Sequence, residues 1–390
     1  MAGRLLVSRV LGCRMGSFGT GGSPRERAAA SQGVALRSTS VLHPTLWTCV
    51  GAAMDILYAA AGAILAAMTL LDVFETVVVP GGSRASLKVA RRLVILLLPV
   101  WKAARGKRHG LSGAFAPLIL VLCFIIWITL LALGFGLMAY AGRDHFQPVL
   151  KSVPDAIYMA GSSIVTIGVS EENALGFGRW LVLAAGFCGL AVMTMAVTYL
   201  LEVQGSVSKR DIGIIKLNTT AGEPPSAVIL LLRFAAIGNQ SELLEVLRES
   251  RNWCATVRQS HSNHPSLIYF QSVGTGAGWP AALGAMLDLG LLCEFCIDDP
   301  SLRGAAVLLR EEGSRMATEL ANVIRLAPES VNGNEPELKQ AVEQLRAAGY
   351  SLRDDVNLAV MAQHRALFLS CVKSLADHLG KPISPMVRQS

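Results

Sequence analysis

Three long apolar stretches dominate the first half of the chain, and each is long enough to cross a bilayer as a helix. They are residues 55–79, 115–141 and 180–201. A helix rises about 1.5 Å per residue, so roughly 20 apolar residues span a hydrocarbon core of about 30 Å. The pattern predicts a mainly α-helical protein with a membrane region in residues 54–203, a tail in residues 1–53 and a further helical region in residues 204–390.

A shorter segment, residues 152–172, lies between the second and third apolar stretches. Residues 154–165 have a helical composition with Pro154 in the first turn, but they are too few to cross a bilayer. A re-entrant helix fits that length. Non-helical backbone at membrane depth is tolerated only where protein buries it or where it lines a water-filled cavity. We therefore expect residues 166–170 to face a channel, where their carbonyl oxygens can replace the hydration shell of a cation.

The sequence Thr166-Ile167-Gly168 resembles the selectivity-filter signature of potassium channels, Thr-Val/Ile-Gly-Tyr-Gly. In that family the signature also follows a short pore helix and precedes the inner helix. Val169 stands at the position of the aromatic residue and Ser170 at that of the second glycine. Because Ser170 carries a Cβ, it either strains the loop or changes its shape, which leaves selectivity for K⁺ reduced or undefined.

The resemblance implies that these five residues bind permeant K⁺, or another monovalent cation, through backbone carbonyls, and that no other cofactor is needed. It also implies a homotetramer, because each chain carries one pore loop and the family builds its filter from four. The acids Glu171 and Glu172 would lie at the outer mouth, where they concentrate cations or simply form a solvated loop. In the third stretch, Gly186 and Gly189 provide either a gating hinge or close helix packing.

Two acids, Asp72 and Glu75, lie near the end of the first apolar stretch and share one helix face. They form either a proton or cation relay or, as we favour, ion pairs at the membrane interface. The basic residues that come next are Arg84, Lys88, Arg91 and Arg92.

Basic residues also set the orientation. Residues 82–109 contain eight Lys and Arg and no acids around an apolar run at 93–101, which predicts an amphipathic helix on a membrane surface. Short basic loops stay in the cytoplasm, so the first stretch runs inward, the pore loop opens outward and residues 204–390 are cytoplasmic.

The composition agrees with a membrane protein, since 52% of residues are hydrophobic and only 16% are charged. The net charge of +7 arises in the membrane half, so it does not indicate a nucleic-acid surface. The eight cysteines are scattered and imply no disulfide framework. Residues 1–53 contain one acid and many Arg, Ser and Gly; we expect an unstructured or artefactual extension, with Met54 as an alternative start.

The pattern in residues 204–390 predicts helices and no large sheet. Helix starts are expected at Ser241 and at Asp299-Pro300, and a capping box at Ser351 is expected to open a long helix that stops at Gly380.

Two motifs in this region have alternative interpretations. Residues 274–278 are glycine-rich, which suits a dinucleotide fingerprint or, as we favour, a helix connector. A second set supplies four zinc-type side chains, although cysteines in an apolar helical run are usually packing residues. This set is His261, His264, Cys293 and Cys296. No catalytic motif is present, so an enzyme is not expected.

Over about residues 54–325 the chain is similar to a bacterial family of pore-loop channel proteins. The segments that carry this similarity outside the filter are residues 71–76, 260–270, 272 and 279–283. The resemblance implies a multi-pass protein of the bacterial inner membrane whose partners are the lipid bilayer and further copies of the chain. The expected function is a tetrameric cation channel; the alternative is a non-conducting membrane scaffold or sensor with the same fold.

Overall fold

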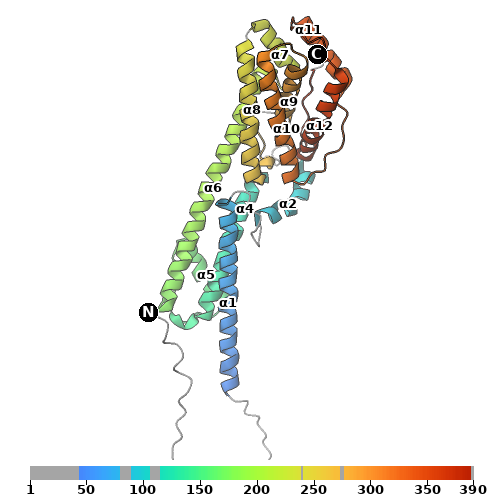
Figure 1. Cartoon of the computed structure of the whole chain (residues 1–390). Coiled ribbons are helices and arrows are strands. Elements are labelled where there is room, and N and C mark those ends of the chain that lie inside the picture. Colours follow the sequence, from blue (N-terminus) through green and yellow to red (C-terminus); the bar gives the residue numbers. More distant parts are fainter. Residues whose placement is uncertain (1–43, 80–88, 106–114, 239, 273–275, 388–390) are drawn as a thin grey trace, which may run out of the picture. The chain divides into compact units, whose positions relative to one another are not determined.

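The computed structural model describes residues 44–79, 89–105, 115–238, 240–272 and 276–387, and this part of the chain is mainly helical (Figure 1). The chain divides into two units, residues 1–49 and residues 50–390. The first helices along the chain are α1 (Pro44–Val77), α2 (Val89–Arg105), α4 (Phe115–Ala141), α5 (Val153–Ile164) and α6 (Phe177–Ala221).

Within these described ranges, three helices are long and apolar enough to span a membrane, which confirms the membrane prediction at that level. They are Val50–Val77, Phe115–Ala141 and Phe177–Ala221. The predicted second stretch has the same bounds as α4. The helix α6 is longer than predicted, because it continues past Leu201 to Ala221 without interruption and so passes through the expected boundary at residue 203.

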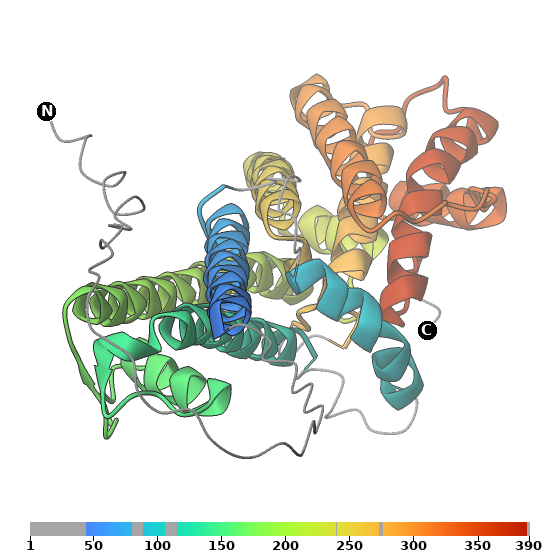
Figure 2. The same ribbon diagram turned by 90° about the horizontal axis from the view of Figure 1, so that it is seen from below.

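The continuity of α6 is explained by its buried positions, which recur every three or four residues along most of its length. This seam packs against α4 and α5 in the apolar half of the helix and against α7, α8 and α9 in the second half. Figures 1 and 2 show α5 beside α4 and α6. One helix therefore connects the segment predicted to form the pore loop with the C-terminal helices.

The C-terminal helices enclose α9. They are α7 (Ala227–Ile237), α8 (Gln240–Asn263), the 3₁₀ helix η2 (Pro265–Tyr269), α9 (Gly278–Phe295), α10 (Pro300–Val323), α11 (Glu335–Ala347) and α12 (Leu358–Leu379). Every residue of α9 from Gly278 to Cys293 is buried, and all sides of this segment are apolar apart from Asp288. The helices α7, α8, α10 and α12 pack around it.

Two of the predicted helix boundaries are confirmed here. Asp299 caps α10 by accepting a hydrogen bond from Ser301 N at 2.8 Å. Gly380 ends α12 in the left-handed conformation, with φ of 63°. The helix α8 begins at Gln240, one residue before the predicted start at Ser241.

The predicted capping box at Ser351 is wrong, because Asn357 caps α12 instead, by accepting from Val360 N at 3.1 Å. The backbone at residues 351–353 bonds elsewhere. Asp298 N donates to Ser351 O, and Arg353 N donates to Cys296 O, both at 2.9 Å. These tertiary hydrogen bonds hold the segment extended beside the end of α9. The helix α12 therefore begins only after Asn357, more than one turn beyond Ser351.

In the described part of the chain, the only sheet is a two-stranded antiparallel one, in line with the expectation of no large sheet. Strand β1 (Phe146–Gln147) pairs with β2 (Asn173–Ala174). It joins the segment before α5 to the segment after the predicted filter. The predicted amphipathic segment forms α2; residues 82–88 and 106–109 lie outside the described residues.

Candidate pore-loop site

The helix α5 has 12 residues, and local sequence explains both its start and its position. Ser152 Oγ caps it by accepting from Asp155 N at 3.3 Å, and Pro154 occupies the first turn. Two glycines on the neighbouring helices allow α5 to approach closely. A Cβ on Gly136 of α4 would lie 2.7 Å from Ile157 Cα, and a Cβ on Gly189 of α6 would clash with the backbone of Ile164.

The chain turns sharply at the end of α5. Thr166 has φ of 60°, and its N–H donates to Ser163 O at 3.1 Å, while Ile167 N donates to Ser162 O at 2.9 Å. These two bonds form a Schellman motif with a threonine at the position that usually holds glycine, at a cost of about 1–2 kcal/mol. Gly168 N also donates to Ser162 O, at 3.0 Å, and Gly168 has φ of 68°.

The turn leaves carbonyl oxygens available. The N–H groups of Thr166, Ile167 and Gly168 donate to carbonyl oxygens of α5. The carbonyl oxygens of residues 166–169, in contrast, accept no hydrogen bond from any donor within the described residues. These residues include two exposed apolar side chains, Ile167 at 67% and Val169 at 56%. Unpaired carbonyl groups of this kind bind water or a cation.

Ser170 is accommodated without backbone strain. Its φ is not positive, unlike that of Gly168. Its hydroxyl accepts from Glu172 N at 3.1 Å and donates to Glu172 Oε2 at 2.7 Å. Glu172 is therefore held against the loop, while Glu171 is exposed. Of the two acids predicted at the outer mouth, only Glu171 is exposed to solvent.

Two further contacts hold the segments that precede and follow the loop. Leu175 N donates to His145 O at 2.7 Å, beside the β1–β2 pair. Arg143 forms a two-point ion pair with Asp55 of α1, with Nη1–Oδ1 at 2.6 Å and Nη2–Oδ2 at 3.2 Å. Sequence reasoning does not find the Asp55 partner, because the two side chains are 88 residues apart in the chain.

The predicted hinge glycines lie within the continuous helix α6. Gly189 contacts the end of α5, and a Cβ on Gly186 would lie 3.4 Å from Ser163 O. The geometry supports the packing interpretation of Gly189. The hinge stays a prediction.

Asp72 is fully buried where α1, α2 and α4 meet. Its Oδ2 accepts from Trp127 Nε1 at 2.8 Å and from Val89 N at 3.3 Å. A carboxylate at the N-terminus of α2 is electrostatically favourable. The two partners lie 55 and 17 residues away in the chain, so no local pattern in the sequence identifies them.

Glu75 Oε2 is buried and has no hydrogen-bond partner among the described residues. The proposed ion pairs with basic residues stay untested. Arg84 and Lys88 lie outside the described residues, as does the side chain of Arg91, and Arg92 is exposed.

The zinc-type residues are not brought together. No group of three or more His, Cys, Asp or Glu able to hold a metal occurs in the described part of the chain. Cys293 and Cys296 are fully buried; burial raises the pKa of both thiols, that of Cys296 to about 12. His261 Nε2 lies 3.4 Å from Arg210 Nη1 instead. These cysteines are packing residues, as favoured from the sequence.

The glycine-rich segment 274–278 is described only from Gly276 onward; Gly274 and Thr275 lie outside the described residues. Gly276 N donates to Glu223 Oε1 at 2.7 Å, and Gly278 begins α9. No parallel strands flank it in the described part of the chain. The geometry fits a connector.

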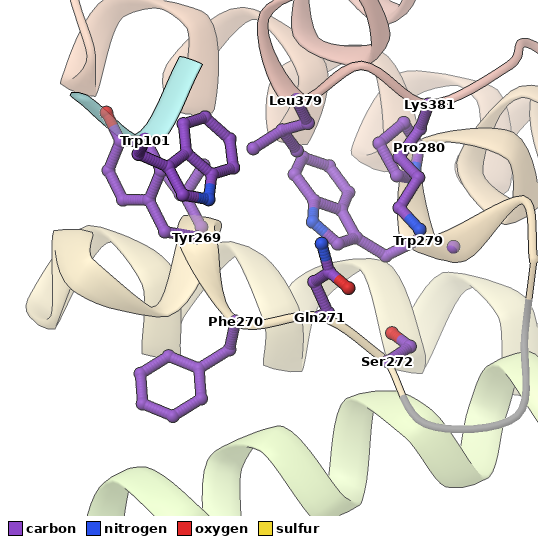
Figure 3. A pocket seen from close by; sticks show the side chains of 11 residues that line it. Trp101, Tyr269, Phe270, Gln271, Ser272, Trp279, Pro280, Leu379 and Lys381 are labelled. Carbon is purple, nitrogen blue, oxygen red and sulfur yellow. The ribbon is translucent and has the colours of Figure 1, made fainter. Parts of the chain in front are cut away.

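A small cavity lies where the end of α2, the segment before α9 and the end of α12 converge (Figure 3). Its volume is about 20 Å³, which is room for one water molecule. Trp101, Gln271, Trp279 and Lys381 line it, and Trp279 Nε1 is buried without a hydrogen-bond partner among the described residues. The cavity suits a structural water rather than a substrate.

Comparisons of the chain with protein-family models, with curated proteins and with solved structures found no match. The assignment of function therefore depends on the geometry of residues 152–172 and of the helices around them.

Proposed function

We propose that this protein is a tetrameric cation channel whose ions pass the carbonyl oxygens of Thr166, Ile167, Gly168, Val169 and Ser170. The observation that carries the proposal is the exposed backbone of residues 166–169 at the end of α5, whose carbonyl oxygens accept no hydrogen bond from the described residues. The helix α5 is too short to span a membrane and lies between two helices that are long enough. Its C-terminal end bears partial negative charge, which favours a cation at that place.

One chain supplies one such loop, and one loop cannot surround an ion. Four copies around a common axis would complete the filter. The side of α6 opposite its buried seam supports this arrangement, because it exposes large apolar side chains for lipid or for neighbouring copies. They include Phe187, Leu190, Val197 and Leu201.

The altered end of the loop favours a second candidate, a non-conducting membrane scaffold or sensor. Ser170 and Glu172 bond to each other, and Val169 replaces the aromatic residue of the channel family. Both departures from the channel signature lie at the same end of the loop, which a protein that does not conduct would no longer need to hold in the shape of a complete filter.

Cation flux into liposomes that contain the purified full chain separates the two candidates. We expect flux in the unmodified protein, with a smaller K⁺/Na⁺ ratio than in the variant Val169→Tyr with Ser170→Gly. Silence of the unmodified protein with flux in this variant would favour the scaffold. Silence of both between about pH 5 and 8 would contradict the channel.

A single methyl group tests the site itself. Gly168→Ala places a Cβ at φ of 68° and is expected to cost about 1–2 kcal/mol and to abolish flux, because the carbonyl geometry changes. Gly238→Ala is the matched control: Gly238 has φ of 69°, and a Cβ on either glycine would meet no described atom within 4 Å. Equal loss of flux in both variants would show that the effect is on stability alone.

A further inference from the structure

Groups that carry positive charge or partial positive charge gather around the small cavity at the start of α9. No side chain caps this helix, its first turn contains no acid, and Gly278, Trp279 and Pro280 line the cavity (Figure 3). The N-terminal end of a helix bears partial positive charge, which favours an anion at that place. A helix end alone does not make a binding site, so the side chains around the cavity decide what it holds.

The indole N–H of Trp279 is a buried donor that lacks an acceptor. Trp279 is only 2% exposed, and its Nε1 has no hydrogen-bond partner among the described residues. Figure 3 shows this nitrogen turned toward the amide group of Gln271, which lines the same cavity. Burying a donor without an acceptor is unfavourable, and buried polar groups are nearly always paired. The cavity is therefore expected to hold an acceptor that the described protein atoms do not supply.

Lys381, which follows the end of α12, brings a full positive charge to the same cavity. Its ammonium donates to Gly276 O at 3.3 Å and forms no ion pair with a described carboxylate. Burial lowers the pKa of Lys381, because the charged form loses contact with water. Glu223 contacts the same glycine, but it accepts from Gly276 N at 2.7 Å instead. No Asp or Glu among the described residues lines the cavity. A water molecule would satisfy the indole, but it would leave the charge of the lysine without a counter-charge.

The size of the cavity limits which anion it can take. Its volume is about 20 Å³, somewhat more than the roughly 10–15 Å³ that one water needs. A phosphate, a sulfate or an organic acid is too large, whereas a monatomic anion fits. We propose that the cavity binds one halide ion, chloride in the cell, between the indole N–H of Trp279 and the ammonium of Lys381. This site does not depend on the proposed channel function.

A bound ion would join the start of α9 to the chain that follows α12. Beyond Lys381 this chain returns to the end of α6. Ser226 Oγ donates to Met386 O at 2.5 Å, and Val228 N donates to the same oxygen at 3.4 Å. These donors lie at the start of α7, a few residues after α6 ends at Ala221. The ion therefore also stabilises residues 381–387 against the junction of α6 and α7.

The line width of the chlorine NMR signal tests binding directly, because chloride that exchanges with a protein site relaxes faster than free chloride. With the purified full chain in detergent, we expect excess line width that added bromide removes by competition. Trp279→Phe keeps an aromatic ring but removes the N–H, and Lys381→Met removes the charge. Each should weaken chloride binding about tenfold or more, as the loss of one charge-assisted hydrogen bond would give. Lys339→Met, at an exposed position of α11, is the matched control and should bind chloride as the unmodified protein does.

Two further measurements locate the ion and its effect. In crystals grown with bromide, the anomalous signal should lie within hydrogen-bonding distance of Trp279 Nε1. In lipid nanodiscs, backbone amides of residues 381–387 should exchange hydrogen about tenfold more slowly in chloride at about ten times its Kd than in gluconate of the same ionic strength. Unchanged exchange in a protein that binds chloride would overturn the effect on residues 381–387 and leave the site standing.

Chloride binding that is absent from the unmodified protein, or that persists unchanged in both variants, would overturn the site. A water, or the oxygen of a turned Gln271 amide, would then be the acceptor for the indole. Lys381 is only partly buried, so Lys381→Met keeps the test decisive even where Trp279→Phe fails to fold. Because binding is measured without flux, a protein that binds chloride but conducts no cation would overturn the channel and not this site.

Discussion

The region around α5 and the region around α9 are both tightly packed, but different chemistry holds them. Around α5, the close contacts depend on missing side chains, since Gly136 and Gly189 let backbone meet backbone. Around α9, a buried arginine joins three elements: Arg365 donates to Asp288 at 2.8 and 2.9 Å and to Glu337 at 2.8 Å. Helices in lipid gain no hydrophobic driving force from packing together, so close contact between them must stabilise their association. Helices in water can also use the burial of apolar side chains and the pairing of charges.

The largest expected effect comes from removing the charge in the second region. Asp288 and Arg365 each have side chains only 3% exposed, so Arg365→Met leaves a buried carboxylate without its counter-charge. We expect a loss of about 3–5 kcal/mol in the free energy of unfolding. Chemical denaturation followed by circular dichroism in detergent measures it.

Arg315→Met provides the control for this prediction. Arg315 is 69% exposed and lies 3.9 Å from Glu311, so its loss should change stability by about 0.5 kcal/mol or less. Similar losses in the two variants would show that burial of the Asp288 pair is not what stabilises the α9 region.

The second effect tests close backbone contact around α5. Gly189→Ala introduces a Cβ against the backbone of Ile164, and α5 must shift to accommodate it. We expect a destabilisation of about 1–3 kcal/mol in thermal unfolding, together with altered flux. Gly205→Ala on the same helix meets no described atom within 4 Å and should be neutral or stabilising by about 0.5–1 kcal/mol. If both variants behave alike, close packing at Gly189 does not matter.

The same contrast explains which features the sequence can predict. Apolar length alone defines α4 and most of α1, and the length and first-turn proline define α5, because these signals are local. The extension of α6 to Ala221 is not predicted, since its seam beyond residue 203 includes buried Arg210 in place of an apolar residue. A buried arginine is identified only by its acceptors, and the two carbonyl acceptors of Arg210 lie 57 and 60 residues away in the sequence.

The residues of the candidate site divide in the same way. A local motif predicts the filter segment, and its turn at the end of α5 is formed by local hydrogen bonds. The ion pair between Asp55 and Arg143 and the buried contacts of Asp72 are visible only in the fold. Likewise, Ser351 has the spacing of a capping box, yet tertiary bonds to the end of α9 outcompete it.

The smallest expected effect is the acid sensitivity of the α9 region. Glu337 is partly buried, which acts to raise its pKa, but the charge and hydrogen bond of Arg365 and the N–H groups of Met386 and Val387 hold the pKa below its usual range. A carboxyl group whose pKa is lower in the folded state stabilises the protein above about pH 4.3, and this contribution is lost as pH falls through the folded pKa.

Glu337→Gln removes that titration, so its unfolding free energy should fall less steeply than that of the unmodified protein between about pH 4.5 and 2.5, by roughly 1 kcal/mol in total. At about pH 7 the variant should be the less stable of the two, because Gln cannot offer Arg365 a charge. Glu343→Gln, exposed on the same helix, is the matched control. Parallel pH profiles for all three proteins would mean that Arg365 is balanced by Asp288 alone, and that the α9 region depends on one buried ion pair rather than on a network of three.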